Sequence, residues 1–175
     1  SGKGDTGTGL YSLGNTLFIF QRRAIWGLYG NSPANFELRN ISNEIGMINK
    51  RSLVEWGELL TFLSDKGVYI FDGSNLKNIT EGVINTTINS WANKTTPVAT
   101  LWGNRYIISN TPSGGSTNSE AYFYDYTRGI WGKCEGLYTN VWSNWQGGTD
   151  TGQIYFGSST QGTIYRWETG GHDDG

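Results

Sequence analysis

One pattern, present in four copies, most constrains what this chain can fold into. Each copy is a glycine followed by an apolar run, a polar turn, and a second apolar run that contains an aromatic residue. The leading glycines are Gly14, Gly57, Gly103 and Gly152, so successive copies lie 43, 46 and 49 residues apart. A strand-based period of about 40–50 residues is typical of the blades of a β-propeller.

Further strand candidates complete each copy. An apolar run precedes each leading glycine, and in the first three copies another run follows the second apolar run. We therefore predict an all-β, propeller-like fold of four-stranded antiparallel meanders, in which Gly, Asn, Ser and Thr supply the turns. The predicted blade-like repeats are approximately 9–42, 45–80, 97–135 and 140–168, within one propeller segment that spans 1–175.

The middle strands are apolar on both faces. Because side chains alternate along a strand, Leu17 and Ile19 point to one face and Phe18 and Phe20 to the other. A sheet with one face in water would instead alternate apolar and polar residues. The pattern predicts sheets stacked face to face, as blades are around a propeller axis. A β-sandwich, which would show stricter alternation, is the second choice.

The fourth copy lacks a trailing strand. After Trp167 the chain continues through the polar stretch 168–175, and the Gly-rich stretch 1–8 is poorly suited to supply a ring-closing strand. We expect about three and a half to four blades, cut from a larger propeller. A complete small propeller with weak ends is the alternative.

Two stretches carry a resemblance to a known group of proteins. The first is Gly4–Leu10 followed by Leu17–Trp26 and Gly30–Pro33, and the second is Ile45–Ile48 with Phe62–Gly73. They resemble propeller-like structural proteins of tailed bacteriophages, namely tail-associated and head–tail connector proteins, including the packaged-DNA stabilisation type. The resemblance covers residues 4–80 well, and the rest shares only the repeat pattern.

The resemblance implies a structural component of the phage virion. Its partners would be other virion proteins, and it would use an assembly interface rather than an active centre, in keeping with an oligomeric ring in the particle. The C-terminal stretch Gly171–Gly175 is similar to the lead-in to another repeat in such proteins. Likeness of fold does not by itself determine function.

Charge and hydropathy argue against nucleic acid and membrane as partners. The net charge is −2, and the densest basic cluster is the pair Arg22 and Arg23, so the sequence has no signal for nucleic-acid binding. No apolar run approaches the roughly 18 residues of a membrane span. The single cysteine, Cys134, rules out an intrachain disulfide and is predicted to be a small packed residue.

The residues suited to catalysis are few. His172 is the only histidine, which excludes a His-based triad and a multi-histidine metal site. Asp72 and Asp125 occupy the same place in the repeat, which favours a turn-forming role. We predict no enzyme, catalytic residue, cofactor or metal site. The acidic residues considered for a glycosidase pair are Glu55, Glu58, Asp65, Asp72, Glu81, Asp125 and Asp150.

The eight tryptophans suggest an alternative function. Trp142 and Trp145 are three residues apart, so in a regular strand their side chains point to opposite faces and one of them would be exposed. We predict that Trp91, Trp142 and Trp145 form a ligand or partner surface. The alternative is then a carbohydrate-binding, adhesin-like propeller that contacts a host surface. The tryptophans expected to pack between sheets are Trp26, Trp102, Trp131 and Trp167.

Two polar loops are expected to meet partners. They span residues 31–35 and 113–119. The longer stretch, 111–119, interrupts the third repeat and reads as a flexible tip or a docking loop, with flexibility favoured by its composition.

Overall fold

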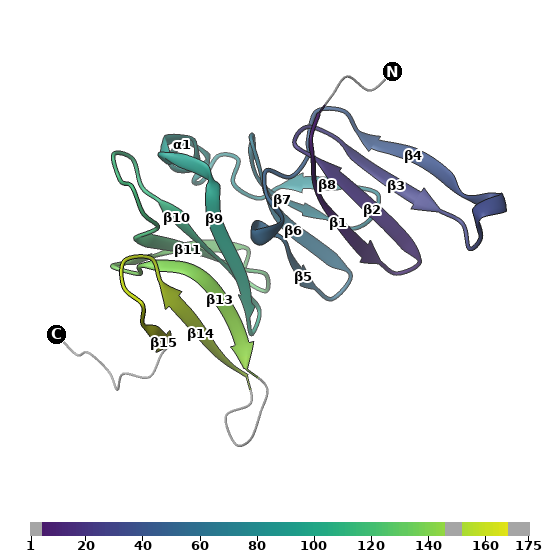
Figure 1. The fold of residues 1–175 in the computed structure, drawn as a ribbon. Coiled ribbons are helices and arrows are strands. Elements are labelled where there is room, and N and C mark those ends of the chain that lie inside the picture. The colour runs from purple at the N-terminus through teal and green to yellow at the C-terminus, as the bar shows by residue number, and fades with distance from the viewer. Residues whose placement is uncertain (1–4, 146–151, 168–175) are drawn as a thin grey trace. The chain divides into compact units, whose positions relative to one another are not determined.

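The computed structural model describes residues 5–145 and 152–167 (Figure 1). They belong to two compact units, one ending at Ser90 and one beginning at Trp91, and each unit is described by itself. Each unit contains two antiparallel sheets.

The unit that ends at Ser90 holds two four-stranded meanders. The first sheet has the order β1-β2-β3-β4, with β1 at Gly7–Leu13, β2 at Thr16–Gln21, β3 at Ile25–Tyr29 and β4 at Glu37–Ser42. The second sheet has the order β5-β6-β7-β8, with β5 at Val54–Trp56, β6 at Leu59–Ser64, β7 at Gly67–Phe71 and β8 at Leu76–Asn78. Short 3-10 turns lie at Pro33–Asn35 and Lys50–Ser52, and helix α1 spans Asn85–Ser90.

The unit that begins at Trp91 repeats this arrangement. The third sheet contains β9 at Asn93–Trp102, β10 at Arg105–Thr111, β11 at Glu120–Asp125 and β12 at Ile130–Glu135, and the fourth contains β13 at Thr139–Trp145, β14 at Gln153–Ser158 and β15 at Ile164–Arg166. All neighbouring strands are antiparallel. The predicted all-β architecture of repeated antiparallel sheets is therefore confirmed. Among the described residues the fourth sheet has three strands.

The sequence did not predict helix α1, because its residues (Asn-Thr-Thr-Ile-Asn-Ser) are weak helix formers. Local contacts fix its start, since the Thr80 carbonyl accepts hydrogen bonds from the amides of Val83, Ile84 and Asn85. Ile88 is fully buried. Tertiary burial therefore overrides the low helix propensity of this segment.

The glycines that define the repeat have a conformational role. Gly14, Gly57 and Gly103 each begin a two-residue turn between the first and second strands of a sheet, at φ values of +56°, +61° and +58°. A Cβ atom at these positions would meet nothing within 4 Å, so the left-handed backbone, not lack of space, requires glycine. Gly152 differs, because β13 ends at Trp145 and the connection to β14 is longer.

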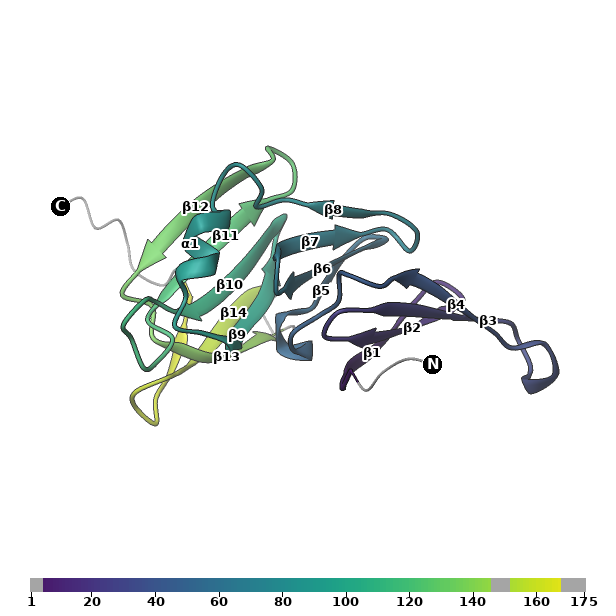
Figure 2. The same ribbon diagram turned by 90° about the horizontal axis from the view of Figure 1, so that it is seen from above.

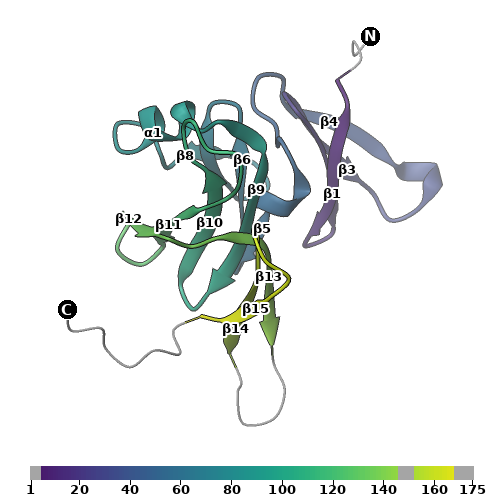
Figure 3. The same ribbon diagram turned by 60° about the vertical axis from the view of Figure 1, so that its left-hand side comes forward.

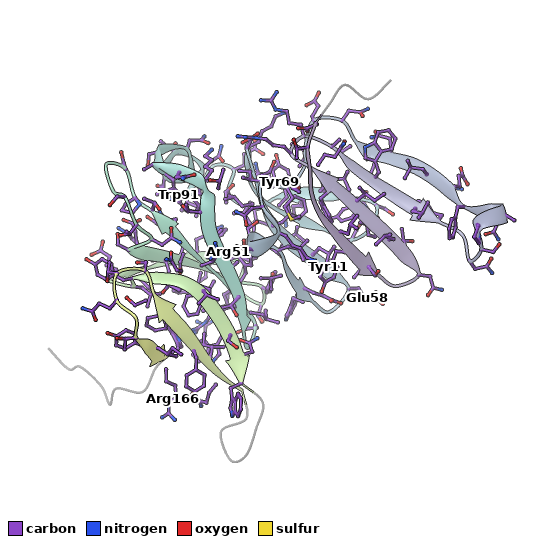
Figure 4. The ribbon with its side chains drawn as sticks, viewed as in Figure 1. Tyr11, Arg51, Glu58, Tyr69, Trp91 and Arg166 are labelled. Carbon is purple, nitrogen blue, oxygen red and sulfur yellow. The ribbon has the colours of Figure 1, made fainter. Side chains whose placement is uncertain are left out.

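The core of the first unit lies between its two sheets (Figure 2). Phe18 packs edge-on against Phe71 with ring centroids 4.9 Å apart, and Phe20 packs against Phe62 at 5.2 Å. At the margin of this interface, the Tyr11 hydroxyl donates to Glu55 Oε2 at 2.6 Å (Figure 4). The two sheets are thus joined face to face, mainly by aromatic rings.

The core of the second unit lies between the third and fourth sheets (Figure 3). Buried Ile107, Ala121 and Ile154 form its centre. A row of five aromatic rings runs beside it, with neighbouring centroids 5.3 to 6.3 Å apart, and its members in order are Trp102, Trp167, Trp142, Phe156 and Tyr165. Trp102 and Trp167 therefore pack between sheets, as predicted. The prediction is wrong for Trp26, because its register with Ile19 places it on the partly exposed face of the first sheet.

Among the second strands of the four sheets, burial on both faces holds for β6 and β10. In β6, the consecutive residues Leu60, Thr61, Phe62 and Leu63 are all 0 % exposed. The run 106–108 of β10 is at most 2 % exposed. In β2, however, Phe18 and Phe20 are buried while Leu17 and Ile19 remain partly exposed. The prediction is wrong for that face of the first sheet, because no described residue of its own unit covers it.

Candidate interaction surfaces

Trp91 is not on the surface, contrary to the expectation from sequence. Its side chain is 6 % exposed, and its ring lies 6.0 Å from that of Tyr122 (Figure 4). When the Asn110 amide is oriented with its oxygen toward the indole, Trp91 Nε1 donates to that oxygen at 3.0 Å. Trp91 is buried because the third sheet supplies both an aromatic contact and a hydrogen-bond acceptor.

Trp142 and Trp145 lie on opposite faces of β13, as their spacing predicts. Trp145 is 57 % exposed. Trp142 is partly buried and packs on Phe156 and Trp167, and its Nε1 atom is buried without a hydrogen-bond partner among the described residues. Of the three tryptophans predicted to form a surface, only Trp145 is largely exposed.

A hollow of about 530 Å³ lies on the fourth sheet, where sequence reasoning did not place a site. Tyr138 and Tyr165, 46 % and 42 % exposed, contribute aromatic surface, together with Phe156, which stacks on Tyr165 at 5.3 Å. Ser158, Thr160 and Gln161 provide hydroxyl and amide groups. No described residue that lines the hollow is charged. Tyrosine and glutamine close to a turn are too common in sequences to have signalled this site.

Four of the candidate carboxylates have structural partners. Asp65 pairs with Arg22, and Glu55 accepts the Tyr11 hydroxyl. Asp72 Oδ1 accepts the amides of Ser74 and Asn75 at 2.9 and 2.6 Å, and Asp125 Oδ1 accepts those of Thr127 and Arg128 at 2.9 and 3.0 Å. The turn-forming role predicted for Asp72 and Asp125 is confirmed.

The bonds around Asp72 also affect its ionisation. The side-chain amide of Asn75, followed by the backbone amides of Asn75 and Ser74, lowers the pKa of the Asp72 carboxyl below its ordinary value. Hydrogen bonds to the charged form favour ionisation. Asp72 is therefore adapted to hold a turn as a carboxylate and not to donate a proton.

The structure does not assemble the remaining carboxylates into a site. Glu58 lines a hollow of about 300 Å³ together with Asp72, Phe18 and Tyr29, but Asp72 is engaged in its turn. Glu81 lies apart from this hollow, and Asp150 lies outside the described residues. Within the described ranges, no group of three or more His, Cys, Asp and Glu side chains is close enough to hold a metal ion. His172 lies outside those ranges.

Cys134 belongs to the apolar cluster of the third sheet, as expected of a packed residue. It lines a small cavity of about 90 Å³ with Trp102, Phe123 and Arg105. The Arg105 guanidinium lies over both rings, 5.5 Å from the Trp102 centroid and 5.2 Å from that of Phe123. These cation–π contacts hold the arginine on the sheet.

The loop at residues 111–119 is anchored at one end. The side chain of Asn118 is buried, with Asn118 only 1 % exposed. Its Nδ2 atom donates to the Thr96 carbonyl at 3.1 Å, and its Oδ1 atom accepts from Thr111 Oγ1 at 2.9 Å. Its backbone carbonyl accepts Ser159 Oγ at 2.7 Å. In the loop at 31–35, the Asn35 side chain accepts the amides of Asn31 and Ser32 and braces the turn.

No family model matches the chain, and no curated protein matches it significantly. Among the helices of the described residues, none has the length and apolar character needed to cross a membrane.

Proposed function

We propose that this chain is a non-enzymatic structural component of a tailed-phage virion that acts through protein–protein contacts. In this proposal its sheets are blades, and the chain supplies part of a larger propeller. The observation that carries the proposal is the packing of repeated meanders face to face through aromatic side chains. The resemblance of residues 4–80 to phage structural proteins points to the same class.

The state of the acidic residues supports a structural role. Asp72 and Asp125 close turns at equivalent places in two repeats, while Asp65 and Glu55 bond to residues of the first sheet. Asp72 and Asp125 thus stabilise turns, and Asp65 and Glu55 help to join the two sheets of the first unit. A pair that hydrolysed glycosidic bonds would need two free carboxyl groups on opposite sides of a substrate.

Mass spectrometry of purified phage particles from the source material tests the proposal. The tryptic peptide Gly67–Lys77 follows Lys66 and ends in lysine, so it is a suitable marker. We expect its recovery in constant proportion to capsid and tail proteins. Absence from intact particles would overturn the virion assignment.

A carbohydrate-binding function is the second candidate, and the hollow on the fourth sheet favours it. Aromatic faces stack on sugar rings, and hydroxyl and amide groups bond to sugar hydroxyls, so the uncharged lining suits a neutral saccharide. Binding to a glycan array is the test. Loss on Tyr165→Ala would place the ligand in the hollow, and loss on Trp145→Ala would place it on the opposite face. Ile130→Ala, at an exposed position of the third sheet, is the control.

A further inference from the structure

The first sheet leaves one apolar face uncovered. Leu10 and Leu38 on this face are 53 % and 54 % exposed. The strand registers place six apolar side chains there in two cross-strand rows: Leu10, Ile19 and Trp26 in one, and Leu17, Leu28 and Leu38 in the other. We call this surface the leading face. It lies opposite the face through which Phe18 and Phe20 pack on the second sheet.

The repeat shows what the leading face is suited to contact. Leu17 and Ile19 stand three and five residues after Gly14, and Leu60 and Phe62 occupy the same places after Gly57. Both Leu60 and Phe62 are 0 % exposed and belong to the core that the first sheet covers. The leading face is therefore the counterpart, in the first repeat, of a face that receives another sheet.

The fourth sheet leaves an apolar face uncovered on its opposite side. Val141, Trp145 and Ile164 are 55 %, 57 % and 75 % exposed, and the registers of β13, β14 and β15 place them together with Tyr155. We call this surface the trailing face. The other side of the same sheet packs on the third sheet through Ile154. At the edge of the trailing face, Arg166 points away from the sheet (Figure 4).

We propose that the leading and trailing faces are two halves of one interface, formed when the trailing face of one molecule packs on the leading face of a second copy. The contact would repeat the packing of the first sheet on the second. The leading face has no charged residue among those in its two rows, and Trp26 is its aromatic member. The trailing face combines Val141, Ile164 and two aromatic residues with the polar Ser143 and Gln153, and Arg166 lies at its margin.

Such an interface is heterologous, because two different surfaces meet. Heterologous contacts produce a ring when the rotation that relates successive copies returns to the first copy, and a filament when it does not. The inference rests on the proposed assembly function and specifies its partner as another copy of the chain.

Complementation between two variants tests the interface. Leu38→Asp disables the leading face and Ile164→Asp the trailing face, at positions where over half of the side chain is already exposed. In analytical ultracentrifugation over a range of concentrations, we expect the unsubstituted chain to self-associate and each variant alone to remain monomeric. An equimolar mixture should form a one-to-one heterodimer and nothing larger, because one functional interface remains. Val83→Asp, at an exposed position off both faces, should associate normally.

Three results would overturn the inference. They are a monomeric unsubstituted chain at every concentration, self-association by either variant alone, and failure of the mixture to form a heterodimer. Circular dichroism verifies folding, and Leu10→Asp with Val141→Asp is a second pair if either first variant is misfolded. Recovery from virions tests the proposed function separately, so a chain that is present in particles but monomeric in solution would contradict only this inference.

Discussion

Arg22 and Asp65 face each other through two hydrogen bonds of 2.9 Å, from Arg22 Nε to Asp65 Oδ2 and from Arg22 Nη2 to Asp65 Oδ1. Arg22 follows β2 of the first sheet, and Asp65 lies in the turn between β6 and β7 of the second. The pair thus joins the two sheets at the rim of their shared core. Its partial exposure, 49 % for Arg22 and 27 % for Asp65, limits its energy.

A double-mutant cycle measures this pair. We expect Arg22→Ala and Asp65→Ala to show a coupling free energy of at most about 1 kcal/mol in urea denaturation, reduced at high salt by screening. The control is Arg39 and Glu37, an exposed ion pair within one strand, for which the coupling should be close to zero. Equal coupling in both cycles would show that the bidentate geometry adds nothing.

The turn glycines should be sensitive to substitution. Gly57→Ala places a side chain at φ +61° and should lower the free energy of unfolding by about 1–2 kcal/mol. Gly57→Asn should cost less, because asparagine tolerates this conformation better. Gly162→Ala, in a turn without positive φ or nearby atoms, is the matched control. Similar losses for Gly57→Ala and Gly162→Ala would contradict the conformational explanation.

Gly132 provides space for an aromatic ring. Phe123 on β11 is the residue paired with Gly132 on β12. A Cβ atom at position 132 would overlap the ring of Phe123. Gly132→Ala should therefore destabilise the chain by about 1–3 kcal/mol through overpacking. In a Phe123→Ala background the same change should cost much less, and thermal melts of the four proteins would show the difference. Additive effects would mean that the ring is not the obstacle.

Stability should decrease at alkaline pH because of Tyr11. Burial, then the hydrogen bond to Glu55, raises the pKa of the Tyr11 hydroxyl from 10.0 to about 12. Since the folded-state pKa exceeds the unfolded one, this contribution is fully present below about pH 10 and is lost as pH rises toward 12. Phenolate absorbance of the folded chain should show several late-titrating tyrosines, because burial also raises the pKa values of Tyr106, Tyr122 and Tyr124, and Tyr11→Phe should remove the part of this late titration that belongs to Tyr11. Glu55→Gln should shift it to lower pH, and no change in either variant would refute the assignment.

Asn118 should be the residue of the 111–119 loop most important for stability. Its buried side-chain amide bonds to the Thr96 carbonyl and to Thr111 Oγ1, so Asn118→Ala removes both hydrogen bonds in a buried site and should cost about 1–3 kcal/mol. Ser116→Ala, at an exposed position of the same loop, should be nearly neutral. Chemical denaturation of both variants compares the two. An Asn118→Ala variant as stable as the unsubstituted chain would indicate that the loop is not anchored there.

Much of the architecture could be predicted from local sequence signals. The turn glycines at 14, 57 and 103 and the turn-forming Asp72 and Asp125 act within a few residues of themselves, so their pattern is visible in the chain. Helix α1 could not be predicted in this way, because its residues favour a helix only once Ile88 is buried.

The exposure of individual side chains depends on distant parts of the chain. Trp91 is buried by Asn110 and Tyr122, and neither contact has a signal in the sequence around it. The hollow at Tyr138 and Tyr165 likewise arises where separate segments meet.

The amino-acid sequence by itself determined the strand repeat, the antiparallel meanders and the chemistry of their turns, because these depend on backbone preferences and on the alternation of side chains along each strand. Only the tertiary structure decided which apolar faces are covered. Leu17 and Leu60 occupy equivalent places in the repeat, yet Leu60 is fully buried and Leu17 is not. The physical reason is that burial depends on which sheet packs on that face, and a strand pattern specifies an apolar face without specifying its partner.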